Sequence, residues 1–219
     1  MDSVRLIEAV THGRVLVRTQ SPSRFLFGFH GYLESAETEM RRLAEIPRAE
    51  SWTLVSVQAL HRVYSGRTQD VVASWMTRQD REEAIRDNIA YVDAVIQDVA
   101  GGAAAPLIVC SGFSQGGAMA LRAATRGSAR SHGVVAVGAD VPPELLADRA
   151  VVFPRVLLAR GARDEWMTEA TFEADVAALR ARNTDVQALV FDGGHEWTAE
   201  VSTAVGEFLR TLPHVARST

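Results

Sequence analysis

Several features that would place the chain in a class at once are scarce or absent. There is one cysteine, Cys110, in 219 residues, so a disulfide within the chain is excluded, and its apolar surroundings predict a buried side chain. Lys and Arg number 23 against 27 Asp and Glu, and the longest basic run is Arg41-Arg42, so nothing indicates a nucleic-acid partner. No apolar run approaches the roughly 20 residues that cross a bilayer, and the N-terminal apolar run is too short for a signal peptide. We therefore expect a soluble, cytoplasmic protein with no membrane insertion.

Cofactor and metal motifs are also missing. The chain has no Walker or dinucleotide glycine pattern, and the stretch GGHEW around His195 lacks the second histidine of the zinc-protease motif. No cofactor and no metal site is indicated. Repeats, low-complexity tracts and long polar linkers are absent as well, which predicts a single domain over residues 1–219.

The chain does contain short apolar runs that alternate with amphipathic ones. The run at 80–102 is the clearest predicted helix: Asp80 and Glu83 resemble a capping box, and apolar residues recur from Ile85 to Val99 at steps of three and four. Runs at 4–10 and 14–19 flank Thr11-His12-Gly13 and predict an N-terminal antiparallel hairpin. Near-continuous apolar strands between helices are typical of a mostly parallel sheet with helices on both faces. The fold class is α/β, and no insertion is long enough for a large lid.

One motif carries the first chemical signal. Gly112-Phe113-Ser114-Gln115-Gly116 fits G-x-S-x-G between a predicted strand and a predicted helix. So abrupt a turn strains the serine backbone, and glycines on either side remove Cβ atoms that would clash. An ordinary glycine-rich turn is the alternative interpretation, and the motif alone does not exclude it.

A serine nucleophile needs a base and a carboxylate that orients that base. Of the six histidines, only His195 combines a strand end, a glycine-rich loop and the last strand of the sheet. Asp164 follows the preceding strand and is favoured as the carboxylate, with Asp140, one strand earlier, as its competitor. The order Ser…Asp…His is that of α/β hydrolases. Backbone N–H groups of Tyr32 and Gln115 are predicted to form the oxyanion hole.

The stretches FHGYLES, GFSQGGAMAL, GARDEW and GGHEW resemble the phospholipase/carboxylesterase family of α/β hydrolases, which includes the acyl-protein thioesterases. The resemblance runs from about Phe25 to Leu209 and implies the α/β-hydrolase fold. It implies the same roles for Ser114, His195 and Asp164 as nucleophile, base and acid, with Tyr32 and Gln115 as oxyanion donors. The chain departs from the family at HGYLE, where HGLGD is common, and over 61–82, which is unlike the thioesterases.

The leading hypothesis is therefore a carboxylesterase-type serine hydrolase that acts on small-molecule esters of small to medium acyl groups, with thioesters as a second class. A small serine peptidase or lipid hydrolase with the same triad is one alternative, and a non-catalytic binding module of the same fold is another. The absence of a lid predicts a shallow, open acyl site. Its expected rim consists of apolar side chains, namely Tyr32, Leu33, Trp75, Met76, Phe113, Trp166 and Trp197.

Overall fold

The computed structural model describes residues 2–66 and 68–212. At its centre is a seven-stranded sheet in the order β1-β3-β2-β6-β7-β8-β9, parallel throughout except where β1 meets β3. The strands are β1 (Arg14–Arg18), β2 (Arg24–Phe29), β3 (Thr53–Gln58), β6 (Leu107–Phe113), β7 (Gly133–Val137), β8 (Arg155–Gly161) and β9 (Val186–Phe191). The predicted α/β fold with a mostly parallel sheet is confirmed.

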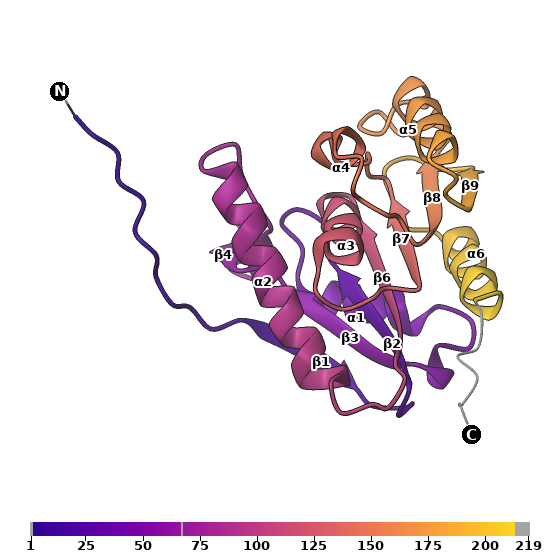
Figure 1. The fold of residues 1–219 in the computed structure, drawn as a ribbon, viewed down its shortest axis with the longest axis horizontal. Coiled ribbons are helices and arrows are strands. Elements are labelled where there is room, and N and C mark those ends of the chain that lie inside the picture. Colours follow the sequence, from indigo (N-terminus) through magenta and orange to yellow (C-terminus); the bar gives the residue numbers. More distant parts are fainter. Residues whose placement is uncertain (1, 67, 213–219) are drawn as a thin grey trace.

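Helices cover both faces of this sheet (Figure 1). Because strand side chains alternate between faces, Phe27 packs into one hydrophobic cluster while its neighbour Leu26 packs into the other. The first cluster is completed by helices α2, α3 and α5, and the second by α1 and α6. The helices are α1 (Ala36–Ala44), α2 (Arg81–Ala100), α3 (Gln115–Arg126), α4 (Pro143–Ala147), α5 (Glu169–Ala181) and α6 (Ala199–Arg210), with a 3₁₀ turn at Ala49–Ser51.

Strand β6 lies in the middle of the sheet, and all of its residues are buried. Cys110 is part of this strand and is fully buried, with its Sγ 3.6 Å from Ser131 Oγ. Burial raises the pKa of the Cys110 thiol to about 12.

The N-terminal edge of the sheet is antiparallel, but the partner strand differs from the one predicted. β1 pairs with β3, with Arg14 opposite Gln58, whereas residues 4–10 form no strand. The apolar side chains of that segment have nothing to pack against, and Val10 is 98% exposed. Figure 1 shows the segment running away from the body of the molecule. A hairpin needs a face to bury, and this segment has none.

Helix α2 begins without the predicted capping box. Asp80 has a left-handed φ of 49°, and its side chain makes no cap hydrogen bond, because an N-cap residue needs an extended backbone to reach the helix N–H groups. The apolar stripe is confirmed, with Ile85, Val92 and Ile96 buried against the sheet. No helix within residues 2–66 and 68–212 combines the length and the apolar character needed to cross a membrane.

A second, two-stranded sheet lies in the segment that departs from the family pattern. It is an antiparallel hairpin of β4 (His61–Tyr64) and β5 (Val71–Ser74). Ala73 of β5 exchanges backbone hydrogen bonds with the loop after β2: its oxygen accepts from Leu33 N–H at 3.0 Å and its N–H donates to Glu34 at 2.8 Å. The hairpin therefore supports the loop that carries Tyr32.

Candidate active site

Ser114 lies alone between the end of β6 and the start of α3. Its φ of 54° is in the left-handed region, and its N–H donates to Val137 of β7 at 2.8 Å. Both motif glycines are required sterically. A Cβ on Gly112 would lie 2.2 Å from the Gly116 oxygen, and one on Gly116 would lie 1.9 Å from the Phe29 oxygen. The motif is therefore a strained turn pressed against β2.

The three polar side chains singled out in the sequence form a hydrogen-bonded row. His195 Nε2 is 2.9 Å from Ser114 Oγ, and His195 Nδ1 is 2.9 Å from Asp164 Oδ2. Asp164 is 4% exposed, and its other oxygen accepts the N–H groups of Trp166 and Met167, each at 2.9 Å. An ionised carboxylate only accepts hydrogen bonds, so Nδ1 carries the proton and Nε2 is left to accept one from the serine.

Asp140, the competing carboxylate, makes no contact of this kind with His195 in the described part of the chain. It lines the pocket beside Ser114 instead. Gly138, two residues before Asp140, lies close to the His195 ring. Gly138 has a φ of +60°, and a Cβ there would lie 3.1 Å from His195 Cε1. Gly138 is not among the residues predicted for the site, although its position directly after β7 is a signal in the sequence.

The two proposed oxyanion donors come from the start of α3 and from the loop after β2. Gln115 is the first residue of α3, so its N–H is one of those a helix leaves unpaired. Tyr32 follows Gly31, whose own N–H donates to Glu34 Oε2 at 2.7 Å. Within residues 2–66 and 68–212, neither the Tyr32 N–H nor the Gln115 N–H has a protein acceptor. Both groups are free to donate to a ligand.

The loop carrying Tyr32 is held by charged and polar partners. Both terminal nitrogens of Arg42 donate to Glu34, each at 2.5 Å. Burial alone would raise the pKa of Glu34, but the hydrogen bonds and the charge of Arg42, together with the Gly31 N–H, outweigh it and the pKa is lowered. His30 is fully buried, and burial lowers its pKa. As a neutral ring it donates from Nδ1 to the Gly31 oxygen at 2.7 Å and accepts the Ala59 N–H at 3.1 Å.

The Gln115 side chain ties the serine turn to the segment after β5. Its Oε1 accepts the Trp75 N–H at 2.8 Å, and its Nε2 donates to the Met76 oxygen at 2.8 Å. Trp75 is fully buried, packs edge-on against Phe29, and donates from Nε1 to the His30 oxygen at 2.9 Å. The prediction that Trp75 lies on the substrate rim is therefore wrong. A buried indole N–H needs an acceptor, which the His30 oxygen supplies, and the Trp75 side chain lies in the interior.

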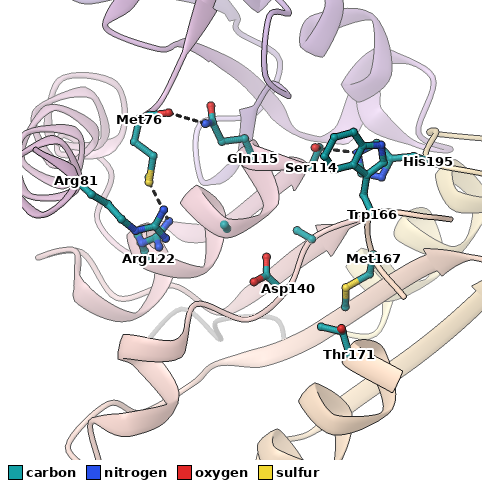
Figure 2. Close-up of a pocket in the computed structure, with 13 residues that line it drawn as sticks. Met76, Arg81, Ser114, Gln115, Arg122, Asp140, Trp166, Met167, Thr171 and His195 are labelled. Carbon is teal, nitrogen blue, oxygen red and sulfur yellow. Dashed lines mark hydrogen bonds between the residues drawn. The ribbon is translucent and has the colours of Figure 1, made fainter. Parts of the chain in front are cut away.

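A pocket of about 390 Å³ opens beside Ser114 and His195 (Figure 2). Met76 and the 83% exposed Trp166 line it, as predicted for the rim. The four further rim candidates are outside the pocket lining. Phe113 is buried beside the His195 ring, with ring centroids 4.9 Å apart, and the Trp197 indole N–H donates to Ser202 Oγ at 2.9 Å. Leu33 lines a separate pocket beside α1, and the Tyr32 side chain is exposed.

No group of three or more His, Cys, Asp or Glu side chains is arranged to hold a metal ion in the part of the chain that the structure describes. The pocket lining includes the Ser114 hydroxyl and the His195 imidazole, and the buried Asp164 carboxylate is hydrogen-bonded to that imidazole.

The chain is similar to known proteins in family and in fold. The family model described as Phospholipase/Carboxylesterase matches residues 69–213. A search of curated proteins found no significant match. Solved structures of similar shape include esterase PE8, at 21% identity and a TM-score of 0.70 over 92% of this chain and 98% of that one. Another is acyl-protein thioesterase 2 of Zea mays, at 18% identity and a TM-score of 0.69, with 91% of this chain and 98% of that one covered. A carboxylesterase of Bacillus cereus has 16% identity and a TM-score of 0.71, with 90% of this chain and 93% of that one covered. At these identities the likeness shows the fold.

Proposed function

The chain belongs to the phospholipase/carboxylesterase family of α/β hydrolases, and from that membership we propose that it is a serine hydrolase that cleaves carboxylic esters through an acyl-enzyme. The observation that carries this proposal is the hydrogen-bonded row from Ser114 through His195 to Asp164 at the wall of an open pocket. A structural serine or histidine would not need the other two members in this order.

In the proposed mechanism, Ser114 Oγ attacks the ester carbonyl carbon while His195 Nε2 takes the hydroxyl proton. The imidazolium then gives this proton to the leaving alcohol, and water repeats both steps on the acyl-enzyme. Asp164 holds the Nδ1 proton and stabilises the imidazolium. The N–H groups of Tyr32 and Gln115 bind the developing oxyanion, a contribution of roughly 2.7–4 kcal/mol for each donor.

The size of the pocket supports small to medium acyl groups as substrates. About 390 Å³ is near the lower end of the range for small-molecule sites. Thioesters fit the same mechanism, since a thiolate leaves more readily than an alkoxide, and they form a second substrate class within the proposal. Aminoacyl arylamides test the peptidase alternative, and faster cleavage of amides than of esters would favour it.

The Ser114→Ala variant tests the proposal directly. We expect hydrolysis of p-nitrophenyl butyrate to fall by roughly 10⁴-fold or more, and labelling by a fluorophosphonate probe to disappear. Ser111→Ala is the matched control, because Ser111 lies in β6, fully buried, and its hydroxyl has no partner among the described residues. Undiminished turnover by Ser114→Ala would exclude this mechanism. Failure of the native protein to label would favour a non-catalytic binding module.

A further inference from the structure

The end of the pocket away from Ser114 and His195 contains a buried cation. Arg122 of α3 lines the pocket, yet it is only 1% exposed. We propose that Arg122, together with Arg81, binds an anionic group on the substrate, so that the preferred esters carry a carboxylate. This inference rests on the proposed function for the reaction, but the anion site itself can be tested without turnover.

The contacts of Arg122 leave part of its guanidinium unused. Nε donates to Glu144 Oε1 at 2.7 Å, and Nη1 lies 3.8 Å from Met76 Sδ. Nη2 is buried and has no partner within residues 2–66 and 68–212. A buried charged donor is costly to leave unpaired, and thioether sulfur is a weak acceptor. Two of the three nitrogens therefore remain available for a stronger acceptor.

Arg81 adds a second positive charge at the same end. It is the first residue of α2, is exposed, and lines the same pocket. Burial is the main cause that lowers the pKa of Arg122, and the charge of Arg81 lowers it further. Figure 2 shows them at one end of the pocket, with Ser114 and His195 at the other.

Two carboxylates lie near this pair of arginines. Glu144 engages only Nε of Arg122 and does not line the pocket. Asp140 does line it, and its charge is felt by Arg122. Counted with Glu144, the two arginines face two carboxylates, so the attraction for an anion comes from the exposed Arg81 and from Nη2 of Arg122, which has no partner among the described residues.

The geometry of α3 connects this end to the reaction site. Gln115, Ala118 and Arg122 all line the pocket, and their spacing puts them on one face of the helix. Eight residues separate Ser114 from Arg122, or roughly 12 Å of helix axis. Helical side chains lean toward the N-terminus, so the guanidinium reaches back toward the serine, and the small Ala118 leaves the space between them open.

The Met76 side chain can move aside when a substrate carboxylate binds Arg122. Its side chain is unbranched and flexible, and its sulfur lies over Nη1 of Arg122. A carboxylate oxygen in that position would form a charge-assisted hydrogen bond, which is stronger than the contact to sulfur. The carboxylate can belong to the acyl group, as in a monoester of a dicarboxylic acid, or to the alcohol, as in an ester of a hydroxy acid.

Two pairs of esters of matched length separate these sources. Monomethyl adipate and methyl hexanoate differ only by a carboxylate in place of a methyl group on the acyl side. The acetyl ester of 4-hydroxybutanoate and butyl acetate differ in the same way on the alcohol side. We expect the native enzyme to favour the anionic member in one pair by roughly ten- to a hundred-fold in kcat/KM.

Substitutions identify the residues responsible for that ratio. Arg81→Gln should lower the preference about tenfold, and the double variant Arg122→Met with Glu144→Gln should abolish it without leaving an unpaired buried charge. Arg86→Gln is the matched control, because Arg86 lies on the same helix, with its side chain 71% exposed, and is outside the pocket lining. Its ratio should equal that of the native protein.

A binding measurement keeps the anion site testable if turnover is absent. Calorimetry with the Ser114→Ala variant should show that monomethyl adipate binds and the neutral methyl hexanoate does not, and that Arg81→Gln in the same background weakens the binding of monomethyl adipate. Binding of monomethyl adipate without any ester hydrolysis would refute the proposed function and leave the anion site standing. Ester hydrolysis with no anionic preference, or a preference that survives both the Arg81 and the Arg122 variants, would overturn this inference alone.

Discussion

Asp164 has both of its carboxylate oxygens engaged, one by His195 and the other by two backbone N–H groups. In Asp164→Asn, the amide oxygen is expected to stay with the two N–H groups, which turns the amide nitrogen toward His195. The imidazole would then accept at Nδ1 and carry its proton on Nε2, where it cannot take one from Ser114. We expect kcat to fall by roughly 10³–10⁴-fold with little change in Tm, measured with p-nitrophenyl butyrate and by thermal denaturation.

Asp140→Asn is the control for this prediction. Asp140 follows the neighbouring strand and lines the same pocket, but it does not contact the imidazole. Its substitution is expected to lower kcat on the neutral ester by less than about tenfold. Equal losses in the two variants would show that Asp164 does not orient His195.

The motif glycines allow a prediction about stability. In Gly116→Ala the new methyl group would lie 1.9 Å from the backbone oxygen of Phe29, and neither element can move without disturbing the sheet. We expect a loss of about 3 kcal/mol or more, which lowers Tm by roughly 6–12 °C.

Gly102→Ala serves as the comparison, since a Cβ at that exposed position meets nothing within 4 Å. The unfolded chain loses freedom there at no steric cost, so Tm should stay the same or rise slightly. A Gly116→Ala protein as stable as Gly102→Ala would contradict the close approach of α3 to β2.

At the level of single residues, a position could be predicted from the sequence where neighbouring residues in the chain determine its conformation. The serine turn could be predicted because its glycines and its place between a strand and a helix are local features. The burial of Trp75 could not, because it depends on the His30 oxygen, 45 residues away. The same holds for Arg122, which lies in an ordinary helical stretch and meets Glu144 only in the folded chain.

At the level of elements, α5 holds the loop after β7 through one carboxylate. Asp175 Oδ2 accepts the Val141 N–H at 2.7 Å, and burial, with a smaller effect from the charge of Asp140, raises the pKa of Asp175 to about 6. The folded state therefore holds this proton more tightly than the unfolded chain, whose carboxyl titrates near its usual value. The stabilising contribution is fully present below about pH 4 and is lost as the pH rises through about 6.

Asp175→Asn tests this linkage. The amide oxygen can still accept the Val141 N–H, but no charge appears between pH 4 and 7, so we expect the variant to equal or exceed the native Tm at pH 7–8. Thermal denaturation from pH 4 to 8 measures the effect, and Glu173→Gln on the exposed side of α5 is the control. An unchanged difference in Tm between native and Asp175→Asn across that range would contradict the raised pKa.

The elements that sequence reasoning misjudged were those whose partners are distant. Residues 4–10 alternate in a strand-like way, yet a strand forms only where another one offers hydrogen bonds and a face to cover, and β1 takes the edge of β3 instead. Conversely, β5 forms by pairing with β4 and, at Ala73, with Glu34 in the loop after β2. The long helices and the buried parallel strands were predictable because their apolar periodicity is strong by itself.

At the level of the whole molecule, the two hydrophobic clusters are opposite sides of one sheet. Each central strand contributes alternate residues to both, so neither cluster can lose its packing while the other keeps its own. The single domain proposed for residues 1–219 is therefore expected to unfold in one cooperative transition.

Two optical probes check this expectation. Trp75 reports on the first cluster and Trp52 on the second, so tryptophan fluorescence follows both sides of the sheet, while circular dichroism follows the helices. The transitions should coincide in urea. Separate midpoints would mean that the chain holds two independently folding units.

The burial of Cys110 also bears on how this molecule can be studied. It is the only thiol in the chain, and in the native state it is out of contact with solvent and holds its proton far above neutral pH. Maleimides and other thiol reagents should therefore not react with Cys110 in the folded protein. A cysteine introduced at an exposed site, such as the position of Trp166 at the pocket mouth, would be the single point of attachment for a dye or spin label, with no need to remove the native one.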